Sequence, residues 1–137
     1  MNSDDKQQVL ELLNRSAYAL DTKNLPMIEG CFAPEAVFVL EIAGVAEVSR
    51  FEGREAIMGL MSGALEAQTD ERKHAVTNAW FREAGADSAT VVSYLTLTAT
   101  EHGEINLITT GVYTDTAKRS GGEWAITERQ LQLDRPY

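Results

Sequence analysis

The sequence predicts one α+β domain, with helices in its first half and a sheet of long strands in its second half. The chain has 137 residues, which is the size of a single domain. Apolar residues recur with helical spacing in three segments before residue 68. From residue 72 onward, four long segments follow one another, separated by turn residues, as in hairpin-linked strands. We expect the strands to curl around the helices into a cone, whose hollow interior is a place where small ligands bind.

The first helix is expected over residues 5–21, because its apolar residues form a single stripe. Ser3, Asp4 or Asp5 is expected to cap it, and acidic residues in the first turn suit the positive end of the helix dipole. The stripe consists of Val9, Leu10, Leu12, Leu13, Ala17 and Leu20.

Two shorter helices are expected, over residues 25–32 and from Gly53 to about Ala67. Asn24 is a suitable cap for the earlier one, and Pro26 fits its first turn. In the later one, helical spacing predicts that Ile57, Leu60, Met61, Ala64 and Leu65 face inward.

The remaining segments have the composition of strands and turns. We expect a turn over residues 33–36, a strand over 37–42 and a hairpin over 43–50 with Gly44 near its tip. The later strands are expected over residues 72–84, 88–101, 104–117 and 122–134.

Composition excludes several functions. The net charge of −9 argues against nucleic acid and anionic membranes, and it favours a substrate that is neutral or meets a locally placed cation. Cys31 is the only cysteine, so an intrachain disulfide and a multi-cysteine metal site are excluded. The polar, acidic N-terminus has no signal-peptide character, and no apolar run approaches the length of a membrane span, so we expect a cytoplasmic protein.

His74 is the first candidate for chemistry, since it lies in a strand-like segment on one face with Val76, Asn78 and Trp80. Histidine titrates near neutral pH and is an effective proton carrier when enclosed. A neutral, hydrogen-bonded core histidine is the alternative. If His74 faces a pocket, Asn78 on the same face is expected to be a polar contact of that pocket. Trp80 is expected to form part of the pocket wall or of the core.

Asp21, at the end of the first helix, projects close to the direction of Leu10 and so toward the covered side of the helix. If it accepts a hydrogen bond from His74, the pair is a general base. The alternative is a surface carboxylate in a polar turn.

Arg129 lies in the last predicted strand, in alternation with Ala125, Thr127, Leu131 and Leu133. It could stabilise an oxyanion or a leaving group, or it could be an ion-paired or edge-exposed structural residue. Three tyrosines could donate hydroxyl protons in the pocket or be simple core residues: Tyr18, Tyr94 and Tyr113.

Recognisable cofactor motifs are absent: there is no phosphate-binding glycine loop and no Gly-x-Ser-x-Gly serine. One strand histidine with scattered acids makes a poor transition-metal site. We therefore expect neither a metal nor an organic cofactor.

Four segments in order resemble the SnoaL-like branch of the NTF2-like superfamily: residues 12–21 (LLNRSAYALD), 32–38 (FAPEAVF), 51–57 (FEGREAI) and 72–78 (RKHAVTN). The resemblance implies three helices packed in a strongly curved mixed sheet around a pocket. Within this branch, the chain is most similar to scytalone dehydratase and hexachlorocyclohexane dehydrochlorinase. Their aspartate–histidine dyad carries over to Asp21 and His74, and the dehydrochlorinase arginine to Arg129.

The sequence departs from both enzymes. Thr98 or Ala99 replaces the second pocket histidine of the dehydratase, and its water-binding tyrosines lack matches at Leu20 and around Val39. Ser16 stands where the dehydrochlorinase has a lysine.

The resemblance implies a dehydratase-like or dehydrohalogenase-like lyase, or an isomerase, acting on a hydrophobic molecule such as a cyclic ketone, polyketide or terpenoid. The alternative is a non-catalytic β subunit of a ring-hydroxylating dioxygenase or a ligand-binding protein. Apolar residues on both faces of the predicted strands over 88–101 and 104–117 indicate a homo-oligomer, a dimer in preference to a trimer.

Overall fold

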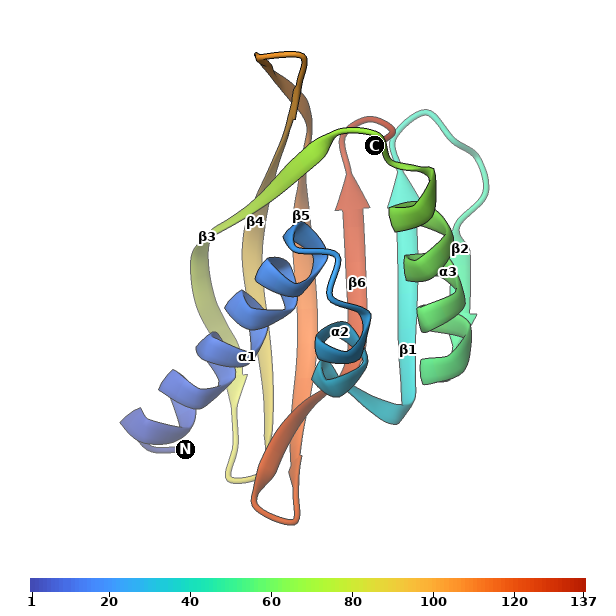
Figure 1. Cartoon of the computed structure of the whole chain (residues 1–137). Coiled ribbons are helices and arrows are strands. Elements are labelled where there is room, and N and C mark those ends of the chain that lie inside the picture. Colours follow the sequence, from blue (N-terminus) through green and yellow to red (C-terminus); the bar gives the residue numbers. More distant parts are fainter.

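The computed structural model describes residues 1–137 and has the predicted α+β architecture. Six strands form one curled mixed sheet in the order β2-β1-β6-β5-β4-β3, and the three helices lie on one face of it (Figure 1). The strands are antiparallel to their neighbours except for β1 and β6, which are parallel. The elements are α1 (Ser3–Asp21), α2 (Leu25–Cys31), β1 (Phe32–Ile42), β2 (Ser49–Glu52), α3 (Arg54–Ala67), β3 (Glu71–Ala84), β4 (Ser88–Glu101), β5 (Glu104–Ser120) and β6 (Glu123–Leu133).

Side-chain caps begin the first two helices. The cap of α1 is Asn2 rather than a residue from 3–5, because Asn2 and Asp5 each accept a hydrogen bond from the other's backbone amide, in a reciprocal capping box. The expected cap of α2 is confirmed: the Asn24 side chain accepts from the Met27 amide at 3.2 Å.

The turn expected over residues 33–36 is wrong, because these residues belong to β1. They nevertheless do not pair with β6. The pairing of β1 with β6 is interrupted after Phe32 and resumes at Val37. Pro34 lies in this interval and has no amide hydrogen to offer a neighbouring strand. The hairpin that follows is confirmed as the β1–β2 connection, with Gly44 at φ 83° in its loop.

Two of the register shifts in the sheet, one in β3 and one in β6, change which of the predicted side chains face the helices. Between Thr77 and Trp80, β3 has one residue more than the facing stretch of β4, and Asn78 adopts φ 57° there. In β6 an extra residue lies opposite the step from Thr116 to Ala117 of β5. Because side chains alternate along a strand, each extra residue reverses the faces of those beyond it.

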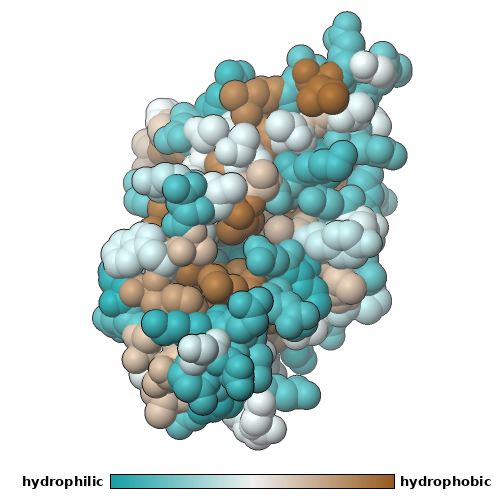
Figure 2. All heavy atoms as spheres, turned by 90° about the vertical axis from the view of Figure 1, so that its left-hand side faces the viewer, coloured by the Kyte–Doolittle hydropathy of each residue, from teal (hydrophilic) through white to brown (hydrophobic).

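The core lies between the helices and the concave face of the sheet. Its largest fully buried side chains come from α1, α2, α3, β4 and β6: Leu12, Ile28, Ile57, Leu95 and Ile126. Figure 2, which faces the β3 side, shows apolar groups interspersed with hydrophilic ones, and one apolar group on the projecting β4–β5 hairpin. No helix combines the length and apolar character that crossing a bilayer would require.

Gly111 tests the close packing of β5 against β6. A Cβ atom at this position would lie 2.5 Å from the Gln132 carbonyl oxygen, so Gly111→Ala should force two backbones apart and lower the free energy of unfolding by about 1–3 kcal/mol. Gly63→Ala is the matched control: nothing lies within 4 Å, and alanine in a helix should add about 0.5–1 kcal/mol. Urea unfolding of both variants measures this, and equal stabilities would contradict the packing.

Candidate functional site

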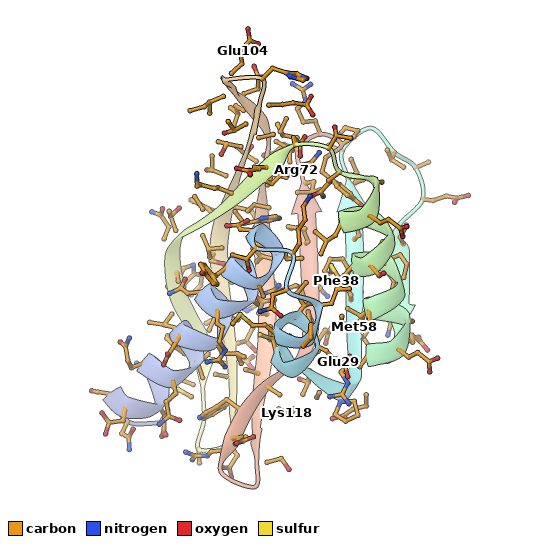
Figure 3. All side chains as sticks on the ribbon, viewed as in Figure 1. Glu29, Phe38, Met58, Arg72, Glu104 and Lys118 are labelled. Carbon is orange, nitrogen blue, oxygen red and sulfur yellow. The ribbon has the colours of Figure 1, made fainter.

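A mostly apolar cavity lies between the helices and the sheet. Its volume, measured as the space open to the centre of a water-sized sphere, is about 70 Å³. Thirteen of its 17 lining residues are hydrophobic, among them Phe38, which Figure 3 labels on the inner side of the sheet. The four polar lining residues are Gln68, Arg72, His74 and Arg129. A cavity of this kind suits an apolar ligand that is oriented by a few polar contacts.

Asp21 and His74 meet at one wall of this cavity. Asp21 Oδ1 lies 2.6 Å from His74 Nδ1, and both side chains are largely covered, with 20% and 14% of their surfaces exposed. The same carboxylate accepts the backbone amide of His74, at 2.9 Å to Oδ1 and 3.2 Å to Oδ2. Asp21 therefore fixes both the backbone and the ring of His74.

The local structure explains why these two residues meet. Asp21 is the last residue of α1, which packs on β3, and β3 is an edge strand of the sheet. The outward amides of an edge strand have no partner strand. The Asp21 carboxylate accepts a hydrogen bond from one of them, the amide of His74. The contact therefore holds the edge strand against α1 and also orients the imidazole ring.

The position of the ring proton follows from this geometry. An ionised carboxylate only accepts hydrogen bonds, so Nδ1 of a neutral His74 carries the proton and Nε2 has a free lone pair. Nε2 makes no hydrogen bond within the protein, and it is not among the buried polar atoms that lack a partner. A neutral His74 thus presents a base to the cavity that it lines.

Arg129 is held in a buried ion pair with Asp115, as the structural alternative for this residue expected. Its Nε lies 2.7 Å from Asp115 Oδ1 and its Nη2 3.2 Å from Oδ2. Nη2 also donates to Ser16 Oγ at 3.0 Å, and the guanidinium stacks 4.5 Å from the centre of the Tyr113 ring. Nη1 makes no hydrogen bond within the protein and is not one of the buried atoms without partners, so it faces the cavity that Arg129 lines.

Burial and charge determine the protonation of this cluster. Burial alone would lower the pKa of Arg129, but Asp115, Tyr113 and Cys31 together outweigh burial and raise this pKa, so Arg129 stays charged. Burial raises the pKa of Tyr113 to about 12; Arg129 lowers it and Asp115 and Asp21 raise it further. At neutral pH the Tyr113 hydroxyl therefore keeps its proton and can donate it to an oxygen.

Four residues predicted to bind the substrate do not line the cavity. Trp80 is 54% exposed, because the bulge before it turns it to the outer face, and Asn78 within that bulge is also exposed. Tyr94, 54% exposed, alternates with the buried Ser93 and Leu95 and so faces outward.

Tyr18, 61% exposed, lies outside the stripe of α1 and borders a shallow surface depression beside α2. Of the predicted substrate-binding residues, only Tyr113 lines the cavity. The predicted neighbours of Arg129 are partly wrong: the β6 bulge turns Ala125 and Thr127 away, while Leu131 and Leu133 share its face.

Sequence reasoning missed several polar residues of the site. Asp115 shares the inward face of β5 with Tyr113, and this alternation was a usable signal. Arg72 precedes His74 by two positions in the same strand and faces the same cavity. Ser16 was named only as a departure from the dehydrochlorinase, and Gln68 and Tyr137 offered no comparable signal. No three side chains of His, Cys, Asp or Glu come together in a way that could hold a metal ion.

The chain belongs to the SnoaL-like domain family, whose profile matches residues 1–130. It is similar to a protein of unknown function with a cystatin-like fold from Nostoc punctiforme, with 22% identity over 98% of this chain and 94% of that one and a TM-score of 0.81. It is also similar to LinA, with 20% identity over 96% and 86% of the chains and a TM-score of 0.77.

A third similar structure is assigned as the β subunit of an aromatic-ring-hydroxylating dioxygenase from Novosphingobium aromaticivorans. The identity is 14% over 96% of this chain and 90% of that one, with a TM-score of 0.81. No curated protein sequence matches the chain. Together these likenesses confirm the NTF2-like cone, and at these identities they show the fold alone.

Tyr113 provides a pH-dependent test of the cluster. Its pKa is raised from 10.0 to about 12 in the folded chain, so its stabilising contribution is complete below pH 10 and is lost as the pH rises to 12. A rise of the pKa from 10.0 to about 12 corresponds to about 2.7 kcal/mol in the free energy of unfolding. We expect the wild type to lose about that much stability relative to Tyr113→Phe between pH 10 and 12, measured by urea unfolding. A difference that does not change with pH would contradict the burial of this hydroxyl.

Proposed function

We propose that this protein is a cofactor-independent lyase or isomerase that removes a proton from carbon in a hydrophobic small molecule. The observation that carries the proposal is the 2.6 Å contact between Asp21 and His74 Nδ1 at the wall of an apolar cavity. It orients His74 so that Nε2, the basic nitrogen of the neutral ring, faces the ligand. General-base catalysis by such a group typically contributes ~10²–10⁴-fold to a rate.

In the proposed reaction, His74 Nε2 takes a proton from a carbon next to a carbonyl or a leaving group. The electron pair of the broken C–H bond forms a carbon–carbon double bond. In an elimination, hydroxide or halide departs with its bonding electrons. In an isomerisation, the carbonyl oxygen takes up the negative charge as an enolate, and His74 then returns the proton to another carbon of that enolate. Asp21, which does not line the cavity, is a positioning residue that stabilises the imidazolium formed in the first step.

Two groups are placed to stabilise negative charge as it develops. Tyr113 lines the cavity with a protonated hydroxyl, and Arg129 presents Nη1 from a guanidinium fixed by Asp115. Fixed donors of this kind act strongly where water is excluded. The apolar lining favours cyclic ketones, polyketides or terpenoids over sugars or nucleotides.

The test uses 5-nitrobenzisoxazole, a probe that releases a coloured phenolate when a base removes its carbon-bound proton. His74→Gln should slow the protein-catalysed reaction by about 10²–10⁴-fold, and Asp21→Asn should slow it severely, because a neutral amide no longer stabilises the imidazolium. His102→Gln is the matched control, because the His102 side chain is 91% exposed. Equal rates in His74→Gln and the control, with unchanged circular dichroism, would contradict the assignment of the base.

The alternative is a non-catalytic role, as a dioxygenase subunit or a ligand carrier. It is favoured by the fold of the dioxygenase subunit and by the bonds from the His74 amide to Asp21, which give the carboxylate a purely structural use. Under this alternative, co-expression with a Rieske-type large subunit yields a stable complex, and the probe reacts no faster than with the His74→Gln variant.

We also propose that the chain forms a homodimer through the outer face of its sheet. Register places Trp80 beside Val92 and Tyr94 beside Val112 on that face, and both aromatic side chains are 54% exposed. An aromatic patch of this kind is typical of interfaces. Light scattering at micromolar concentration should give a dimer, and Trp80→Glu should give a folded monomer. A monomeric wild type would contradict the proposal.

A further inference from the structure

Arg72 places a guanidinium at the mouth of the cavity. It lies two residues before His74 in β3, so the two side chains share a face, and their Cα atoms are about 6–7 Å apart. Figure 3 shows its side chain on the helix-covered side of the sheet, in the space between α3 and the end of α1. Arg72 also borders an adjoining surface depression beside α3, which shares Leu60, Ala64, Gln68 and Tyr137 with the cavity. The depression therefore adjoins the cavity at Arg72, and we call this junction the mouth of the cavity.

The bonds that Arg72 makes within the protein hold it in place and leave donors free. Its Nε lies 3.0 Å from Asp70 Oδ1 and its Nη2 3.5 Å from Oδ2. Nη1 makes no hydrogen bond within the protein, although only 14% of the side chain is exposed, and it is not among the buried atoms that lack a partner. A guanidinium has five N–H donors, so at least the two on Nη1 are available to a ligand.

The charges around the cavity favour an anion at Arg72. Arg129 is neutralised by a fully buried carboxylate bound through two hydrogen bonds, whereas Asp70 remains 19% exposed and its second contact to Arg72 is long. The chain as a whole carries a net charge of −9, so an anionic ligand needs a local cation to approach. Arg72 is the charged side chain that lines both the cavity and the depression, and guanidinium groups bind carboxylates through paired hydrogen bonds.

We propose that Arg72 determines substrate specificity by binding an anionic oxygen group, a carboxylate, at the cavity mouth while the apolar body of the substrate enters toward His74. This deepens the proposed function, since it names the substrate class of the same cavity. It requires only binding, so it can be tested without any turnover.

The experiment uses two small ligands of the same shape, 1-naphthoate and its neutral counterpart 1-naphthamide. The chain has two histidines, so the proton signals of their Cε1–H groups report on binding: His74 in the cavity and the exposed His102 as an internal reference. Both ligands should shift the His74 signal and leave His102 unchanged. Naphthoate should bind at least about tenfold more tightly than naphthamide to the wild type.

Arg72→Gln should weaken naphthoate binding by about tenfold or more and change naphthamide binding by less than about threefold. Arg72→Lys, which keeps the charge, should recover part of the affinity. Arg50→Gln is the matched control: it removes the same charge from an exposed pair on β2 and should leave both affinities within about twofold.

Three results would overturn the proposal: equal affinity of the wild type for the two ligands, equal losses of both in a folded Arg72→Gln variant, or no effect of either ligand on His74. The first two would leave the proton-abstraction assay unaffected and would reject the anionic substrate alone. Conversely, loss of the proton-abstraction function with naphthoate selectivity intact would identify an anion-binding carrier.

Discussion

The contact between Asp21 and His74 is the constraint on which the rest of the site depends. It joins two residues separated by 53 positions, the last residue of a helix and the middle of an edge strand. One carboxylate accepts both the amide and the ring nitrogen of the histidine. The helix end, the strand edge and the ring orientation are therefore fixed together, and the remaining ring nitrogen is left to the cavity.

A second polar cluster faces the same cavity and has a different physical character. Arg129 and Asp115 are almost fully covered, and Ser16 and the Tyr113 ring complete the surroundings of the guanidinium. Removing one member of such a buried pair leaves an uncompensated charge and costs about 3–5 kcal/mol. The cluster therefore presents fixed donors, whereas the proposed role of His74 is to take up a proton. The proposed function rests on this arrangement, in which an apolar cavity has an imidazole on one wall and fixed donors on another.

Local periodicity predicted most of the fold, because helical and strand patterns depend on neighbours in sequence. The long strands over 72–84, 88–101 and 104–117 coincide with β3, β4 and most of β5. The failures come from non-local or single-residue effects. One extra residue near Asn78 reversed the predicted face of Trp80, and one in β6 separated Arg129 from Thr127. The partner of Arg129 depends on the register between β5 and β6, which places Asp115 opposite Arg129. The pattern of residues within a single strand does not encode that register.

The most direct measurement of the central claim is the tautomer of His74, read from the ¹⁵N chemical shifts of its two ring nitrogens. The account predicts that, in the neutral ring, Nδ1 carries the proton and Nε2 has the shift of an unprotonated nitrogen. It also predicts that Asp21→Asn disturbs this assignment. A neutral His74 protonated at Nε2, or an unbiased mixture of tautomers, would contradict a ring held by Asp21 with its base directed into the cavity.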